Sequence, residues 1–266
     1  MEPIYFFHNP KAGGSSLQAV LRSKYLQESV APLLVHGMID QLERNGDYRD
    51  FRGYSLYAGH NSLDVYLSVK NGHRTITNFR HPTTRLISLY NFFRYSVIVS
   101  DDVLRSKRYT AVKLAKEVGF HEFLASESPD ICVYTSNQHT RQLSASMWEY
   151  RSEREVSAPT ARRTIDELAC YYVCEYPELS NLWLKETLGL PQLPTENVTE
   201  FSGKLTIFEL KSETHKLLLE KNKLDVNLYI YAVNKLLKKY TATINSGECM
   251  ARFWARLTDR TRARPP

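Results

Sequence analysis

The sequence lacks a long hydrophobic run and any sign of a leader peptide. No stretch of about 18 apolar residues occurs in the 266-residue chain, so no membrane-spanning helix is predicted. The N-terminal segment MEPIYFFHNPKAGG has no basic leader followed by an apolar stretch and a small-residue cleavage site. We therefore expect neither a membrane anchor nor a signal peptide, and a cytoplasmic protein.

Cysteine is also scarce. The four cysteines are Cys132, Cys170, Cys174 and Cys249. Cys170 and Cys174 both lie in the predicted strand CYYVCEY, where four residues separate them by roughly 13 Å, too far for a disulfide bond. No pair has the C-x2-C spacing of a zinc site. The sequence therefore excludes a disulfide framework, predicts no metal site and fits a reducing compartment.

Most of the excess positive charge lies at the C-terminus. The formal net charge is +6, and residues 251–266, with five arginines and one aspartate, contribute +4 of it. The remainder is nearly neutral, so we expect no nucleic-acid partner. We interpret 251–266 as a solvated basic tail; a role in gathering anionic ligands is the alternative. With 42% hydrophobic and 24% charged residues, the rest reads as a single globular domain over 1–250.

Two similar units of strand, turn and helix organise the first hundred residues. The apolar run Ile4–His8 predicts a buried strand, followed by a glycine turn and a helix over Ser15–Tyr25. Arg74–Phe79 predicts a second strand, before a break at Arg80-His81-Pro82 and a helix over Thr83–Tyr95. The further predicted elements are strands at Tyr54–Ala58 and Tyr171–Glu175 and helices near Ala111–Ser126, Thr160–Leu168, Pro177–Leu188 and Leu224–Tyr240. This alternation predicts an α/β fold with a mainly parallel sheet.

The first turn, Pro10-Lys11-Ala12-Gly13-Gly14-Ser15-Ser16, has the composition of an anion site. The first amides of a helix lack intrahelical partners, and glycines let a phosphate approach them closely. A tight turn without a ligand is the alternative reading. The nucleotide-triphosphate loop G-x4-G-K-[ST] places its lysine after the glycines, whereas Lys11 precedes them, and G-x-G-x-x-G is absent. A kinase, an ATPase or a Rossmann dinucleotide site is therefore disfavoured.

Two segments carry a family resemblance. FFHNPKAGGSSL resembles the 5′-phosphosulfate loop of sulfotransferases that use 3′-phosphoadenosine 5′-phosphosulfate (PAPS), in the branch that includes the heparan sulfate 2-O- and 6-O-sulfotransferases. FRHPTTRLISLYNFFR is similar to that family's 3′-phosphate motif, with His81 where aspartate is common. Weaker similarities occur at YAGH (57–60), NQHTRQLS (137–144), Tyr172–Leu188, ENVT (196–199) and Asp225–Tyr240. The resemblance implies a P-loop-like three-layer sandwich with a central, mainly parallel sheet flanked by helices.

The resemblance also implies roles for individual residues. The residues expected to hold the 5′ end of PAPS are Lys11, Gly13, Gly14, Ser15 and Ser16, and those expected at the 3′-phosphate are Arg80 and Ser88. Lys11 is also expected to stabilise the leaving oxygen. His60, behind a strand and a glycine, matches the family's catalytic base, and histidine suits that role because its ordinary pKa lies near neutrality.

Other polar residues keep two readings. Arg85 fits either the 3′-phosphate motif or an ordinary surface position on its helix, and His8 is expected to support the loop. His139 and Arg141 either border the ligands or are structural. The aromatic and basic segments 90–95 and 147–154 either stack on an acceptor or pack against the protein.

The expected function is PAPS-dependent transfer of a sulfuryl group to an acceptor hydroxyl, of a carbohydrate by analogy with the family, releasing 3′,5′-adenosine diphosphate without a metal. Sulfation of a small non-carbohydrate metabolite is the alternative within enzymes. A nucleotide- or nucleic-acid-binding module that kept the loops without chemistry is the alternative from another class. The sequence predicts neither the acceptor nor the oligomeric state.

Overall fold

The computed structural model describes residues 1–33, 51–100, 102, 106, 109–145, 156–194 and 203–244. The basic tail, Cys249 and the segments 147–154 and 196–199 lie outside these residues. The strands are β1 (Ile4–Phe7), β2 (Leu56–Gly59), β3 (Arg74–Phe79) and β4 (Cys170–Val173). The helices of the first half are α1 (Gly14–Arg22), η1 (Gln27–Ser29), α3 (Leu63–Val69), α4 (Pro82–Asn91), η3 (Phe92–Ser96), α6 (Thr110–Glu117), α7 (Phe120–Ala125), α8 (Pro129–Thr135) and α9 (Gln138–Gln142). Those of the second half are α10 (Ala158–Glu167), α11 (Pro177–Leu188), η5 (Ile207–Glu209), α12 (Ser212–Lys221) and α13 (Lys223–Ile244).

The four strands form one parallel sheet in the order β2-β1-β3-β4. Ile4 on β1 pairs with Leu56 on one side and with Arg74 on the other. The connections from β1 to β2 and from β2 to β3 run in opposite directions along the sheet, so right-handed crossovers place α1 and α3 on opposite faces. The α/β class, the parallel sheet and its flanking helices confirm the predicted architecture at that level.

The core strands are buried because their side chains face helices on both sides. All four residues of β1 are buried, and they belong to a hydrophobic cluster with the other strands, α1, α10, α11 and α13. Continuous apolar runs of this kind are typical of parallel strands covered on both faces. The run IYFF therefore places the end of β1, and the turn that follows, against the core.

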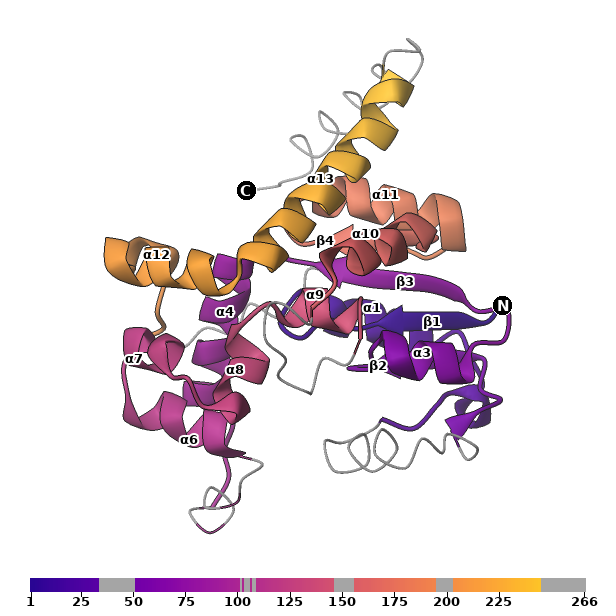
Figure 1. Ribbon diagram of the computed structural model, residues 1–266. Helices are drawn as coiled ribbons and strands as arrows, with labels where there is room; N and C mark the ends of the chain where they lie inside the picture. Colours follow the sequence, from indigo (N-terminus) through magenta and orange to yellow (C-terminus); the bar gives the residue numbers. More distant parts are fainter. Residues whose placement is uncertain are drawn as a thin grey trace, which may run out of the picture.

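A second hydrophobic cluster lies outside the sheet. It is formed by α4, η3, α6, α7, α8 and α12, with Phe93 and Phe123 among its buried side chains. In Figure 1 these helices lie together beyond the end of the sheet at which the strands finish. The sequence predicts one helix near Ala111–Ser126, but α6 and α7 divide this segment at Val118–Gly119. Short helices α8, α9 and α12 were not predicted.

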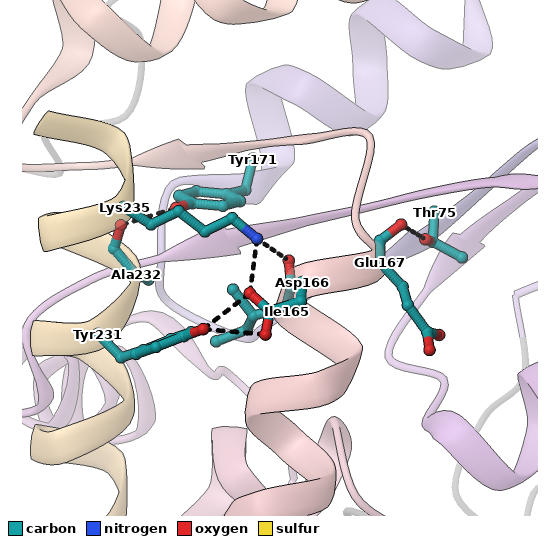
Figure 2. A network of polar contacts seen from close by, with 8 residues as sticks. All are labelled: Thr75, Ile165, Asp166, Glu167, Tyr171, Tyr231, Ala232 and Lys235. Carbon is teal, nitrogen blue, oxygen red and sulfur yellow. Dashed lines mark hydrogen bonds and ion pairs between the residues drawn. The ribbon is translucent and has the colours of Figure 1, made fainter. Parts of the chain in front are cut away.

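The long helix α13 is fastened to α10 and β4 by polar contacts (Figure 2). Asp166 on α10 accepts a hydrogen bond from the Tyr231 hydroxyl at 2.7 Å and forms an ion pair with Lys235 at 2.7 Å. Tyr171 on β4 donates its hydroxyl to the carbonyl of Ala232 at 2.7 Å. The C-terminal part of the described chain is therefore attached to the same sheet that carries the two turns. In the described ranges, no helix is both long enough and apolar enough to cross a bilayer.

Candidate active site

The two turns singled out in the sequence come together at the carboxyl end of the sheet. Strands β1 and β3 are neighbours, but the chain leaves β1 toward β2 and leaves β3 toward β4 on the other side. Such a reversal at adjacent parallel strands is the place where open α/β sheets commonly bind ligands. The turn after β1 and the turn after β3 flank this point.

The backbone of the first turn adopts an unusual conformation. Lys11 and Gly13 have φ angles of 60° and 75°, in the left-handed region. Glycine adopts this region without cost, whereas lysine does so only where the surrounding structure holds it. A Cβ atom added at Gly14 would lie 2.2 Å from a ring carbon of His8. The start of α1 is therefore pressed against the buried His8 ring, which supports the turn as expected.

Asn78 holds this turn in place from the neighbouring strand. Its side-chain amide donates to the carbonyls of Asn9 at 2.9 Å and Ala12 at 2.8 Å, and its Oδ1 accepts from the amide of Asn9 at 2.8 Å. The Asn78 side chain thereby contacts backbone groups immediately before the turn and within it. Sequence reasoning did not single out this residue, although an asparagine near the end of the predicted strand RTITNF was the available signal.

The side chain of Arg80 joins the second turn to the first. Its Nη1 donates to the carbonyl of Lys11 at 3.2 Å, and its Nε donates to the Thr84 hydroxyl at 3.2 Å. Ser88, partly exposed, lies four residues after Thr84 on α4, hence on the same face of that helix. The structure therefore brings Arg80 and the turn of Lys11 into direct contact and places Ser88 one helical turn from the Arg80 contact at Thr84.

The first turn carries concentrated positive charge. Burial lowers the pKa of Lys11, and the nearby charges of Arg80 and Lys204 lower it further. Lys204 is held close by its neighbour Leu205, whose backbone exchanges two hydrogen bonds with the Asn91 side chain, at 2.8 and 3.0 Å. Sequence reasoning missed Lys204 because 113 residues separate it from Asn91. Three cations gathered at one turn fit an anionic ligand.

His60 follows β2 and lies beside the same turn. Its Nδ1 is 2.9 Å from the carbonyl oxygen of His8, and the two imidazole rings are 4.6 Å apart. A carbonyl only accepts, so Nδ1 carries the hydrogen and Nε2 has the basic lone pair of the neutral ring. Burial lowers the pKa of His60, the hydrogen bond to His8 opposes this, and the charge of Lys11 adds to the lowering. The ring is therefore neutral at pH 7, as a general base must be.

The segment around His139 is buried and bonded to α13. His139 is buried, its Nε2 lies 3.3 Å from the Thr77 hydroxyl, and burial lowers its pKa to about 3. Arg141 is buried and donates to the carbonyls of Ser136 and Val133. Asp225 on α13 accepts hydrogen bonds from the amides of His139 and Thr140. These contacts fix the short helix α9 to α13 and favour the structural reading of both residues.

The structure excludes one of the two interpretations of Arg85. It is only 1% exposed, so the surface position on α4 is wrong. Its Nη1 donates to Oε1 of Gln138 at 2.8 Å and its Nη2 to the carbonyl of Tyr134 at 3.2 Å. These bonds tie α4 to α8 and α9. Arg80, rather than Arg85, is the arginine in contact with the first turn.

Three of the four cysteines lie within the described residues. Cys132, Cys170 and Cys174 are free thiols. In the described part of the chain, no three His, Cys, Asp or Glu side chains gather in a way that would hold a metal ion.

A scan against models of known protein families and a search of curated proteins find no match to this chain.

Proposed function

We propose that this protein is a sulfotransferase that transfers the sulfuryl group of PAPS to an acceptor hydroxyl, that of a carbohydrate, in the cytoplasm. One observation carries the proposal: the Arg80 guanidinium donates to the carbonyl of Lys11, so both turns that resemble donor-binding motifs adjoin each other. PAPS has two anionic ends, and two adjoining cationic turns match that feature of the molecule. The assignment of the sheet to the P-loop-like class belongs to the same proposal.

The two turns offer different ligands to the donor. The first amides of α1 and the hydroxyls of Ser15 and Ser16 would hold the 5′-phosphate, because the N-terminus of a helix attracts anions. Arg80 and Ser88 would hold the 3′-phosphate, the arginine through its fork of donors. Bound PAPS would supply the sulfuryl group.

The chemistry falls to Lys11 and His60. His60 Nε2 takes the proton of the acceptor hydroxyl while that oxygen forms its bond to sulfur. The bond between sulfur and the bridging phosphate oxygen breaks, and its electron pair remains on 3′,5′-adenosine diphosphate. Lys11 stabilises the negative charge that develops on this oxygen, which is the point in the reaction where a fixed cation has most effect.

A ligand comparison tests the donor site without knowledge of the acceptor. A ligand that binds only the folded state raises its melting temperature. We expect 3′,5′-adenosine diphosphate to stabilise the protein and ATP, at the same concentration, to have little effect. Arg80→Ala should lose the stabilisation. Equal stabilisation by ATP, or none by the bisphosphate, would reject PAPS as the donor.

An acceptor screen then tests the reaction. Candidate carbohydrates and small hydroxyl metabolites are incubated with PAPS, and mass spectrometry detects a product heavier by one sulfuryl group. We expect the product to form with the native protein and to be strongly reduced with Lys11→Ala. High affinity for a nucleic-acid duplex, falling steeply with salt, would instead favour a binding module.

A further inference from the structure

An aromatic ring faces the lysine of the first turn. Nζ of Lys11 lies 4.1 Å from the centre of the Phe92 ring. A protonated amine at this distance is attracted by the negative face of the ring. Phe92 is 38% exposed, whereas the adjacent Phe93 is 8% exposed and belongs to the second hydrophobic cluster. The Phe92 ring therefore contacts a cation at the site while its neighbour fills the core.

The backbone at Phe92 is a single π-turn that is held on both sides. The amide of Val97 donates to the carbonyl of Phe92, five residues earlier, at 3.1 Å. Arg94 donates to the carbonyl of Ala115 at 2.7 Å, and the Tyr95 hydroxyl donates to the carbonyl of Gly203 at 2.8 Å. Single π-turns within helices occur frequently at functional sites. The backbone segment that carries the Phe92 ring is thus held by contacts that do not involve Lys11.

Lys11 needs an attractive partner because its surroundings repel it. Arg80 and Lys204 are both close enough to lower the pKa of Lys11, and its own charge lowers the pKa of His8 and of His60. These groups belong to the ends of β1, β2 and β3 and to the segment before η5. Arg80 and Lys204 repel the Lys11 ammonium, whereas the Phe92 ring is an attractive contact for it.

We propose that Phe92 is a positioning residue, which holds the Lys11 ammonium beside the first turn until an anionic group replaces the ring as its partner. A phosphate oxygen binds an ammonium more strongly than a neutral ring does, so the exchange favours the ligand. The nature of the anion rests on the proposed function. The contact between ring and ammonium does not, and the two are tested separately.

The test measures the chemical reactivity of the Lys11 amine. Trace acetylation of the intact protein, quantified by peptide mass spectrometry between about pH 7 and 11, reports the fraction of each amine that is neutral and accessible. The exposed Lys24 serves as the internal reference for an intact fold. The variants are Phe92→Leu, which keeps an apolar side chain without the ring, Phe92→Tyr, which keeps the ring, and Phe208→Leu. Phe208 is 95% exposed and supplies the matched control.

We expect Phe92→Leu to raise the reactivity of Lys11 relative to Lys24 by about two- to fivefold near pH 8, because the ring no longer favours the charged form. Phe92→Tyr and Phe208→Leu should leave it unchanged. Unchanged reactivity in Phe92→Leu, or an equal rise in Phe92→Tyr, would overturn the proposal.

Addition of 3′,5′-adenosine diphosphate separates this inference from the proposed function. We expect the nucleotide to protect Lys11 from acetylation in the native protein and in all three variants. If it protects none of them while Phe92→Leu still raises the reactivity, the proposed donor is wrong and the positioning role of Phe92 stands.

Discussion

The two strand-to-helix turns differ in how the backbone amides around the start of the following helix are hydrogen-bonded. At the first turn, α1 begins after Gly13, and no side chain among the described residues caps it. At the second, His81 caps α4 by accepting from the amide of Thr83 at 3.3 Å. The carboxylate of Glu175 also accepts from the amide of His81 at 2.9 Å. At the second turn, side chains of the protein therefore accept hydrogen bonds from backbone amides. At the first turn, no described side chain accepts a capping hydrogen bond from the amides of α1.

This difference predicts two modes of anion binding. At the first turn, an anion meets backbone amides, the helix dipole and Lys11. At the second, Glu175 is an internal anion, so an external one must be held by side chains, Arg80 first. His81 Nδ1 accepts the capping hydrogen bond at this position, as a carboxylate would. Residues of the first turn should thus control chemistry, and those of the second should control affinity.

The largest expected effect is at His60. His60→Ala should bind 3′,5′-adenosine diphosphate normally but lose turnover by about 10²- to 10⁴-fold, because general-base catalysis is removed. Burial lowers the pKa of His60, so the rate of the native protein should rise with pH, with its midpoint below the ordinary histidine pKa of about 6.5. Single-turnover rates at saturating donor measure both.

The matched control is His121→Ala. His121 is an exposed histidine on α7, one of the helices that form the second hydrophobic cluster. It should keep the native rate and pH profile. Near-native turnover in His60→Ala would assign the base to another group. A parallel loss of melting temperature and donor affinity would show that His60 only packs.

The next effect is at Lys11. Lys11→Ala should lower turnover by about 10²- to 10³-fold, since a preorganised cation acts mainly on the charge of the transition state. Affinity for 3′,5′-adenosine diphosphate should fall far less, because under the proposed function the backbone amides would still hold the 5′-phosphate. Rapid-quench kinetics and calorimetry separate the two quantities, with Lys24→Ala as the control. A loss confined to affinity would contradict the distinction between the turns.

At the second turn, the expected loss is in binding. Arg80→Lys keeps a charge but removes the fork, and should weaken binding of 3′,5′-adenosine diphosphate about tenfold or more, as expected for a charged hydrogen bond. Ser88→Ala should cost less, about two- to tenfold, because a neutral hydroxyl is removed. Arg74→Lys, at the opposite end of β3, is the control. Unchanged affinity in calorimetry for both site variants would reject this turn as a phosphate site.

The sheet and the helices next to it were largely predictable, because residues close in the sequence mark where these elements begin and end. β3 spans Arg74–Phe79 and α11 spans Pro177–Leu188, as predicted. In α11, Pro177 occupies the first turn and Gly189, with φ of 64°, ends the helix. The predicted strand at Tyr171–Glu175 is shifted to Cys170–Val173, within the usual uncertainty of strand boundaries.

The second hydrophobic cluster was less predictable, because short helices depend on packing for most of their stability. α8 and α9 have seven and five residues, and their positions depend on buried Arg85 and Asp225 from distant segments. The predicted helix Thr83–Tyr95 ends as α4 at Asn91 and continues as the π-turn η3. The hydrophobic period of the segment gave no sign of this change.

In the candidate site, the residues were predictable and their contacts were not. The sequence pattern identified Lys11, Arg80 and His60 singly. The links among them pass through groups remote in sequence, such as the amide of Asn78 and the carbonyl of His8. Lys204 was missed because it does not belong to the turn that it influences. Phe92 falls in the segment 90–95 named in the sequence analysis, but the pattern gave no sign of its contact with Lys11.

The smallest expected effect tests the internal anion of the second turn. Glu175→Gln removes a negative charge, but its side-chain oxygen still accepts from the amide of His81, so the turn should keep its shape. Glu175 is exposed, and interactions between exposed charges are weak, so affinity for 3′,5′-adenosine diphosphate should tighten only about two- to fivefold. Raising the salt concentration should reduce this gain, because salt screens exposed charges.

The control is Glu117→Gln on α6, which makes the same change in net charge elsewhere and should leave affinity unchanged. Calorimetry at low and high salt compares the three proteins. Weaker binding in Glu175→Gln would mean that the carboxylate shapes the second turn rather than competing with its ligand.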